Sequence, residues 1–257
     1  MESNVEKITS RSNPICVHFK KLGAGKSYRD EHGEFICDGE KLLKEALEAG
    51  IQINKILTSK CINFTLPDTA RVYNAKSDLI DSLSPLKTSQ GLLFTCKTPQ
   101  PLDVDYSSGT HILLDGIQDP GNVGAIIRTA CAFDIESVIL TEGCADLYNL
   151  KTIRASMGAV FRQKASILSF DQINQLNQAG IKFIAAMNSI DATDIMNIDM
   201  QNAIIILGNE GRGISEKLLA LCAGSLNIPI SANCESLNVA AAAVIIIWEA
   251  RNGKCHH

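Results

Sequence analysis

The sequence predicts an α/β protein with two domains, the larger of which holds a parallel sheet covered by helices on both faces. After residue 110, apolar runs of strand length alternate with helical patterns, and this alternation is typical of parallel strands joined by helices. Before residue 100, a shorter series of similar elements predicts a small α/β domain. Because prolines and glycines separate the two series, we expect domains at residues 1–100 and 110–257 with a linker at 101–109.

The N-terminal domain is predicted from short apolar runs and two helical patterns. A helix is expected over residues 39–49, where Gly50 would end it. A second, short helix over residues 77–83 would use Ser77 as its N-cap. The strands of this domain are expected at residues 35–37, 53–58, 71–74 and 91–96.

The C-terminal domain is predicted from a longer series of alternating elements. Strands are expected at residues 111–114, 137–141, 182–187, 204–207 and 227–230. Helices are expected at residues 123–133, 150–160, 171–179, 215–222 and 238–249. The last helix is apolar nearly all round, so it must be buried against a sheet or against another subunit.

The segment at residues 115–130, DGIQDPGNVGAIIRTA, is the most informative stretch of the chain. It follows an apolar run, the Pro120-Gly121 step predicts a turn, and Asn122 is placed to open a helix. A strand, a glycine-rich turn and a helix N-terminus together direct backbone N–H groups toward a ligand. For this segment alone, a plain strand-to-helix connection with an Asn cap explains the pattern equally well.

Two later segments favour a functional site over that simpler explanation. A strand that ends at Gly208 is followed by Asn209 and Glu210, among glycines that let the backbone approach a ligand closely. Farther along, residues 226–230 predict a short strand, residues 231–237 a polar loop, and Asn238 the start of the apolar helix.

These three segments, in this order, resemble the SpoU family of RNA ribose 2′-O-methyltransferases, which belongs to the SPOUT class. Residues 151–162 also resemble the segment that links the family's motifs, and residues 12–39 resemble the RNA-binding domain that precedes the catalytic domain in many members. Two positions depart from the usual pattern, namely Ala240 and the stretch at residues 131–134. The matching motif residues are Asn122 and Arg128, then Asn209, Glu210 and Gly213, then Ser236, Leu237, Asn238 and Val239.

The resemblance implies a fold, a cofactor and an assembly. It implies a C-terminal domain with a deep trefoil knot, which no periodicity argument would propose. The cofactor would be S-adenosyl-L-methionine, bound by three loops around Gly208, Ile228 and Leu237. The family works as homodimers with the active site at the interface, and the apolar last helix fits that arrangement.

The resemblance also assigns catalytic roles. Arg128 would act on the ribose 2′-hydroxyl, either as a base or, as we favour for a guanidinium, by binding an RNA phosphate and stabilising the developing alkoxide. Asn122 would orient Arg128 or the ribose, and Glu210 would hold its loop or pair with Arg128 across the interface. Ser236 and Asn238 would fix the third loop. Simpler structural roles remain open, with Asn122 and Asn238 as helix caps and Glu210 as a cap of loop N–H groups.

The charge distribution predicts an RNA contact in the N-terminal domain. The net charge is −4 overall, but residues 1–100 hold 14 basic and 12 acidic residues, net +2, against 10 and 16, net −6, in the remainder. Residues 7–29 hold six basic residues and no acidic one, with Tyr28, Phe19 and His18 placed to stack on bases. A solvated basic edge is the alternative. The expected RNA-binding residues are Lys20, Lys21, Lys26 and Arg29.

Several classes of protein are excluded or disfavoured by the sequence. The nine cysteines are odd in number and form no C-x-x-C motif, so neither a zinc site nor a disulfide framework is indicated, and a reducing cytoplasmic location is expected. No apolar run is long enough for a membrane span, and the first residues lack a signal-peptide pattern. The last two residues, His256 and His257, read as a tag remnant better than as a metal site.

Two glycine-rich stretches imitate nucleotide-binding motifs without completing them. Residues 22–27 resemble the end of a phosphate-binding loop, but the first Gly of such a loop would fall at position 20, which is Lys20. Residues 208–213 are rich in glycine but do not match the dinucleotide-binding motif. Neither ATP nor NAD is therefore implied, which disfavours a dehydrogenase. The remaining alternative to a methyltransferase is a non-catalytic RNA-binding protein of the same fold. A separate N-terminal domain favours ribosomal RNA over transfer RNA, and DNA is not expected as a substrate because it lacks the 2′-hydroxyl.

Overall fold

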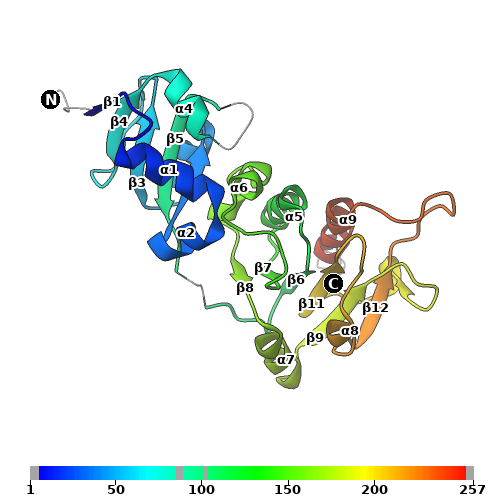
Figure 1. Ribbon diagram of the computed structural model, residues 1–257. Helices are drawn as coiled ribbons and strands as arrows, with labels where there is room; N and C mark the ends of the chain where they lie inside the picture. Colours follow the sequence, from blue (N-terminus) through cyan, green and yellow to red (C-terminus); the bar gives the residue numbers. More distant parts are fainter. Residues whose placement is uncertain (1–5, 85–88, 101–102, 253–257) are drawn as a thin grey trace. The chain divides into compact units, whose positions relative to one another are not determined.

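The computed structural model describes residues 6–84, 89–100 and 103–252 (Figure 1). The chain divides into two compact units, one of residues Met1–Gln100 with Asp146–Phe161, the other of Pro101–Ala145 with Arg162–His257. The first residues, the start of the predicted linker at 101–102, Cys255 and the pair His256-His257 lie outside the described residues.

The N-terminal unit is built on a five-stranded mixed sheet in the order β1-β4-β3-β5-β2. The strands β1, β4 and β3 run parallel, whereas β5 is antiparallel to both β3 and β2. The predicted strands are all present, and β3 has the predicted bounds. The strands are β1 (Glu6–Ile8), β2 (Glu34–Asp38), β3 (Ile53–Thr58), β4 (Arg71–Ala75) and β5 (Leu92–Lys97).

The described residues before 100 form the α-helices α1 (Pro14–Ala24), α2 (Lys26–His32), α3 (Glu40–Glu48) and α4 (Ser77–Leu83). Helix α1, which the periodicity did not predict, begins at Asn13, whose side chain accepts a hydrogen bond from the Ile15 N–H. Its apolar face packs into the core with Cys16, Phe19 and Leu22 completely buried. Phe19 therefore cannot stack on RNA bases, and that expectation is wrong.

Residues 146–161 pack with the N-terminal unit rather than with the strands that precede and follow them in sequence. They form α6 (Leu150–Ser156) and the 3-10 helix η1 (Ala159–Phe161). Phe35 of β2 stacks on Tyr148 at 4.6 Å between ring centroids and on Phe161 at 6.3 Å. The buried Arg29 donates to Asp146, with 2.5 Å between Nη2 and Oδ2, and to the Leu22 carbonyl. The sequence places this segment within domain 110–257, whereas its contacts lie elsewhere.

The C-terminal unit is built on a seven-stranded sheet in the order β10-β12-β9-β11-β6-β7-β8. Every pairing in this sheet is parallel, as predicted. The central strands β6 and β11 are buried along nearly their whole length. The strands are β6 (Thr110–Asp115), β7 (Ser137–Leu140), β8 (Ala165–Ile167), β9 (Lys182–Ala186), β10 (Thr193–Asp194), β11 (Ala203–Gly208) and β12 (Gly224–Asn227).

Helices cover this sheet. Residues of α7 (Phe170–Gln178) and α8 (Glu216–Leu219) share a core with the alternate side chains Leu113, Ile139 and Ile206 of the strands. Helices α5 (Pro120–Ala132) and α9 (Val239–Asn252) lie side by side (Figure 1). On α9, Ala243, Ile246, Ile247 and Ala250 are buried, so the prediction of a packed apolar helix holds for one of its faces.

Several local predictions are wrong, and three of the errors have a physical reason; the helix expected at 215–222 is also shorter and covers only Glu216–Leu219. Helix α5 begins at Pro120, because Asp119 is its cap and a first-turn proline needs no N–H donor. Helix α4 has Lys76, not Ser77, in the cap position. The predicted strand at 227–230 lies at β12 instead, since Pro229 cannot donate to a ladder. The predicted helix at 150–160 ends at Ser156, because Met157 and Gly158 adopt left-handed backbone.

Candidate functional site

Three segments that are far apart in sequence meet at the carboxyl edge of the large sheet. Strands β6 and β11 pair in register up to Asp115 and Gly208, so the loops that follow them start side by side. The Asn122 side-chain amide donates a hydrogen bond to the Glu210 carboxylate. Asn238, just before α9, donates to the Asn122 side-chain oxygen at 3.2 Å. The structure thus brings together one predicted residue from each of the three motifs.

The Asn122 side chain is held from both ends by these bonds. Its NH2 group donates to a carboxylate oxygen of Glu210, and its oxygen accepts from the amide of Asn238, so the Asn122 amide has one favourable orientation. Asn122 is not the cap of α5, because Asp119 accepts from the Asn122 backbone N–H at 2.9 Å. Its side chain is therefore available to join the neighbouring loops. Asn238 does serve as a cap as well, accepting from the Ala240 backbone N–H at 2.9 Å.

The loop after β11 is tied into a tight turn by Asn209. Its backbone exchanges two hydrogen bonds with Gly213, at 3.0 and 2.8 Å, and its side-chain oxygen accepts from the Gly211 and Arg212 N–H groups. Its side-chain nitrogen donates to the Gly116 carbonyl at 2.8 Å, which links this loop to the one after β6. A Cβ atom on Gly208 would lie 2.4 Å from the backbone of Gly213, so only glycine fits there.

Asp115 is a positioning residue that the sequence reasoning did not single out. Its carboxylate accepts from the Ser215 backbone N–H at 2.7 Å and from the Thr141 hydroxyl at 3.4 Å. Asp115 thereby joins the ends of β6, β7 and the loop after β11. A carboxylate at the end of a buried parallel strand is the signal that could have found it.

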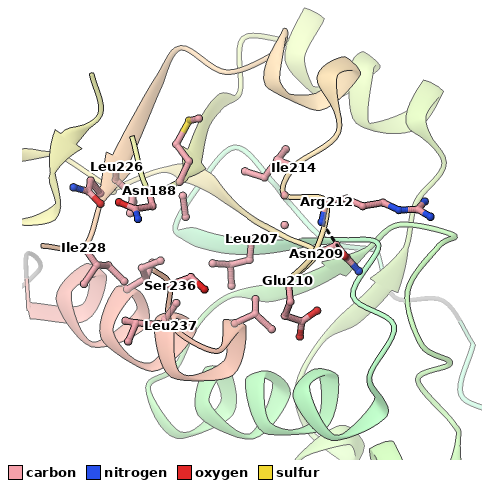
Figure 2. Close-up of a pocket in the computed structure, with 18 of the residues that line it drawn as sticks. Asn188, Leu207, Asn209, Glu210, Arg212, Ile214, Leu226, Ile228, Ser236 and Leu237 are labelled. Carbon is pink, nitrogen blue, oxygen red and sulfur yellow. Dashed lines mark hydrogen bonds between the residues drawn. The ribbon is translucent and has the colours of Figure 1, made fainter. Parts of the chain in front are cut away.

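A cavity of about 400 Å³ opens between the loop after β11 and the N-terminal half of α9 (Figure 2). Gly208, Ile228 and Leu237, the three positions predicted to hold a cofactor, all line it. Figure 2 shows Leu207 between the loop of Glu210 and the segment that carries Ser236 and Leu237. Because Glu210 lines the cavity and also binds Asn122, the cavity is adjacent to the junction of the three motifs.

The cavity is lined by aliphatic side chains with polar residues such as Glu210 and Ser236 among them. Its walls carry aliphatic side chains, and its volume falls within the range of small-molecule sites. The aliphatic lining residues include Leu207, Ile214, Leu226, Ile228, Ile230, Leu237, Val239 and Ile246.

Arg128 lies on the exposed surface of α5, one and two-thirds helical turns beyond Asn122. In the part of the chain that the structure describes, no hydrogen bond or ion pair involves its guanidinium, and it does not line the cavity. Within one chain the Glu210 carboxylate accepts from Asn122, and the pairing of Glu210 with Arg128 across a subunit interface stays a prediction. Arg128 is thus an exposed cation beside the site.

The predicted RNA-binding residues divide into two groups. Lys20, Lys21 and Lys26 are exposed on α1 and α2. Arg29 is buried, and its guanidinium is occupied by Asp146 and the Leu22 carbonyl, so it offers nothing to a phosphate. Arg29 is therefore a structural residue.

The sequence predicted neither a metal site nor a membrane-spanning helix. Among residues 6–84, 89–100 and 103–252, no cluster of His, Cys, Asp and Glu has a composition that could hold a metal ion. None of the helices in those same ranges is long and apolar enough to cross a membrane.

Comparison with known families gives two matches that together span most of the chain. The SpoU rRNA Methylase family matches residues 109–248. The MRM3-like substrate binding domain matches residues 13–93. The first match contains all three motifs, and the second contains α1, α2 and their lysines.

Individual proteins are similar over nearly the full length. The chain is 30% identical to the 23S rRNA (guanosine(2553)-2′-O)-methyltransferase RlmP of Bacillus subtilis (strain 168), over 96% of this chain and 100% of that protein. It is 31% identical to the 23S rRNA (uridine(2479)-2′-O)-methyltransferase of Streptomyces viridochromogenes, over 95% and 91%. The crystal structure of an AdoMet-bound rRNA methyltransferase from Sinorhizobium meliloti superposes with a TM-score of 0.88, at 28% identity over 98% of this chain and 99% of that one.

Proposed function

Because this chain belongs to the SpoU rRNA Methylase family, we propose that it is an S-adenosylmethionine-dependent methyltransferase that acts on a ribose 2′-hydroxyl of ribosomal RNA. The observation that carries the proposal is the junction at which Asn122 binds both Glu210 and Asn238 beside the cavity. Two relatives are named as 23S rRNA 2′-O-methyltransferases, which supports ribosomal over transfer RNA.

The cavity fits the proposed cofactor. A side chain at Gly208 would collide with the Gly213 backbone. The absence of a side chain there lets the loop backbone form one wall of the cavity. Aliphatic residues such as Leu207 and Leu237 would enclose the adenine ring, and backbone groups near Ile228 would meet its polar edge. When bound, S-adenosylmethionine supplies the methyl group. The related Sinorhizobium meliloti structure is described as AdoMet-bound, which supports this assignment.

In the proposed reaction, the residues around the cavity would bind and orient the RNA substrate. Arg128 would bind an RNA phosphate next to the target ribose and stabilise the negative charge that develops on the 2′-oxygen. Asn122, fixed by Glu210 and Asn238, would hold the ribose in line for displacement. Ser236, which lines the cavity, would fix the third loop.

We include a homodimer in the proposal. The outer side of α9 exposes Val244, Ile245 and Trp248, and the Trp248 side chain is 51% exposed although it contacts Phe133 edge-on. An apolar helix face of this kind is typical of a subunit interface. A second copy at α9 would also bring further residues toward Arg128, which has no partner among the described residues of its own chain. The trefoil knot implied by the family remains part of the same proposal.

The lysines of the N-terminal unit would supply RNA affinity. Lys20, Lys21 and Lys26 are exposed, and the match to a substrate binding domain covers all three. Each lysine that neutralises a phosphate would make binding more sensitive to salt. A cytoplasmic location fits the cysteines, because all eight that the structure describes are free thiols.

The alternative is a non-catalytic RNA-binding protein with the same fold, and one experiment separates the two. Purified protein is titrated with S-adenosylmethionine by calorimetry and then incubated with the labelled cofactor and 23S rRNA or single-stranded DNA of matching sequence. We expect saturable cofactor binding and label transfer to RNA alone. Absence of cofactor binding, or equal labelling of DNA, would refute the proposed activity. Comparison of 2′-O-methyl positions in total RNA with and without the gene would then identify the nucleotide.

A further inference from the structure

We propose that His32, Tyr28 and Lys21, supported by His18 and Glu34, form a stacking site for one unpaired nucleobase of the RNA substrate. This inference rests on the proposed function, because it assumes an RNA substrate, and it assigns a task to a cluster that lies outside the methyl-transfer site. The cluster belongs to α1, α2 and the start of β2 in the N-terminal unit.

The support of this cluster is a buried carboxylate. Glu34 is 7% exposed and accepts hydrogen bonds from His18 Nε2 at 2.5 Å, from Asn54, and from Lys55 Nζ at 2.9 and 3.1 Å. Burial alone would raise the pKa of Glu34, but these donors outweigh it and lower the pKa to about 2. The carboxylate is therefore charged at neutral pH and keeps its donors in place.

His18 links the Glu34 carboxylate to Tyr28. The His18 Nε2–H donates to the Glu34 carboxylate, and the Tyr28 hydroxyl lies 3.1 Å from His18 Nδ1 on the other side of the ring. The two rings also meet edge to face, with centroids 5.7 Å apart and planes at 62°. Tyr28 is thereby fixed in position and in rotation. A fixed aromatic ring loses little entropy when a ligand stacks on it.

His32 extends the ordered rings to the surface. Its ring stacks on Tyr28 with centroids 3.9 Å apart and planes at 25°. Its Nδ1–H donates to the Tyr28 carbonyl at 3.0 Å. The His32 side chain is 34% exposed. Tyr28 stacks on one face of the imidazole, and the His18 ring centroid lies 5.5 Å from it with the planes at 55°, so two rings hold His32 while about a third of its side chain stays exposed.

The charges around the stack suit a nucleotide. The Lys21 ammonium lies 5.3 Å from the centre of the Tyr28 ring, and Lys20 and Lys26 are exposed on the same two helices. The Glu31 carboxylate lies 4.0 Å from His32 Nδ1 and is 74% exposed. Flat rings beside ammonium groups match a nucleobase and its phosphate, and RNA-binding modules use this combination for unpaired bases.

The same unit offers a matched control on α3 and the segment after β3. There the Lys44 ammonium lies 5.0 Å from the Phe64 ring, which is also partly exposed. Among the residues that the structure describes, no second ring stacks on Phe64, and Lys44 is bound by Glu40 at 2.8 Å. A surface aromatic with a lysine is thus present at both places, but only the His32 cluster is stacked, anchored and surrounded by free lysines.

The test measures binding of a fluorescently labelled single-stranded RNA of roughly ten nucleotides to the full chain at several salt concentrations. His32→Ala should weaken binding about 5- to 100-fold, the usual effect of losing one base stack. The slope of log affinity against log salt should stay unchanged, because no phosphate contact is lost. Lys21→Gln should instead flatten that slope by about 0.7. Phe64→Ala should bind as the wild type does.

A second RNA of the same length with one abasic position identifies the stack directly. Wild-type protein should bind this RNA more weakly than the intact one when the gap falls at the stacked position, and His32→Ala should lose that difference. Wild-type affinity in His32→Ala, or an equal loss in Phe64→Ala, overturns the inference. Cofactor binding and methyl transfer by the wild-type protein are measured in parallel. Their failure would refute the proposed function itself, whereas an unaffected His32→Ala in an active methyltransferase refutes only the stacking site.

Discussion

Among the individual residues of the site, Arg128 and Asn122 differ in how the chain supports them. Asn122 is fixed by two hydrogen bonds to other motifs, whereas Arg128 lies exposed on α5. A residue held in place within one chain can orient a substrate, and a free guanidinium can bind an incoming phosphate. The two side chains therefore suit different steps of the proposed reaction.

Replacement of Arg128 by alanine should lower methyl transfer about 100- to 1000-fold, the usual effect of losing one donor to a developing oxyanion. Arg128→Lys should be nearly as impaired, since lysine cannot grip a phosphate with two parallel hydrogen bonds. Cofactor affinity should stay close to wild type in both variants, because Arg128 does not line the cavity. Single-turnover rates and calorimetry measure the two quantities separately, and wild-type rates in either variant would remove Arg128 from the mechanism.

The Glu34 carboxylate should make the stability of the N-terminal unit fall as the pH is lowered. Its pKa is lowered from 4.5 to about 2, so its contribution is complete above pH 4.5 and is lost as the pH falls toward 2. Glu34→Gln should destabilise the protein at neutral pH and make unfolding less dependent on pH within that window. Thermal unfolding of both proteins between those pH values tests this. An identical pH dependence in the two would mean that other carboxylates are responsible.

At the scale of structural elements, the loop after β11 depends on its glycines to different degrees. A Cβ on Gly208 would lie 2.4 Å from backbone atoms, whereas one on Gly211 would make an ordinary contact of 3.6 Å with the Asn209 side chain. Gly208→Ala should therefore displace the turn and abolish measurable cofactor binding. Gly211→Ala is the control and should change cofactor affinity little. Calorimetric titration with S-adenosylmethionine decides the matter, and equal affinities in both variants would contradict this account.

Secondary-structure elements were predicted correctly where the spacing of apolar residues matches the side of the element that is buried. The buried parallel strands β6 and β11 were located within one or two residues, and β3 with its own bounds. Prediction failed where a single residue overrides the pattern. Pro229 shortens a strand, and Asp119 with Pro120 starts α5 earlier than Asn122 would.

The sequence predicted which residues belong to the site but not the hydrogen bonds that join them. Three motifs implied that Asn122, Glu210 and Asn238 belong together, yet the direct bonds of Asn122 to the other two depend on where α5 begins. The burial of Arg29 could not be read from its basic neighbourhood, because its partner Asp146 is 117 residues away in sequence. Asp115 was missed for the same reason, since its partner Ser215 is 100 residues away in sequence.

For the whole molecule, the ion pair of Arg29 with Asp146 is the contact whose loss should be felt most widely. Both side chains are largely buried, so Arg29→Ala leaves an unpaired carboxylate and should destabilise the N-terminal unit by about 3–5 kcal/mol. Exchange of both residues for apolar ones, Arg29→Met with Asp146→Leu, should restore much of that loss.

Urea unfolding followed by circular dichroism measures this destabilisation. The single tryptophan, Trp248, lies in the C-terminal unit, so its fluorescence reports that unit separately. We expect the Arg29→Ala transition to shift in circular dichroism more than in fluorescence. Unchanged unfolding in Arg29→Ala would show that the pair contributes nothing to stability.

The packing of residues 146–161 with the N-terminal unit has a consequence for synthesis and for evolution. The chain passes between the two units three times, at residues 100, 145 and 161. During translation, the N-terminal unit cannot complete its packing at residue 100, because Tyr148 and Phe161 have yet to leave the ribosome. In recombination, a single crossover in the linker would exchange one half of the Arg29–Asp146 pair without the other. Inheritance of the two units together is therefore favoured by the path of the chain itself.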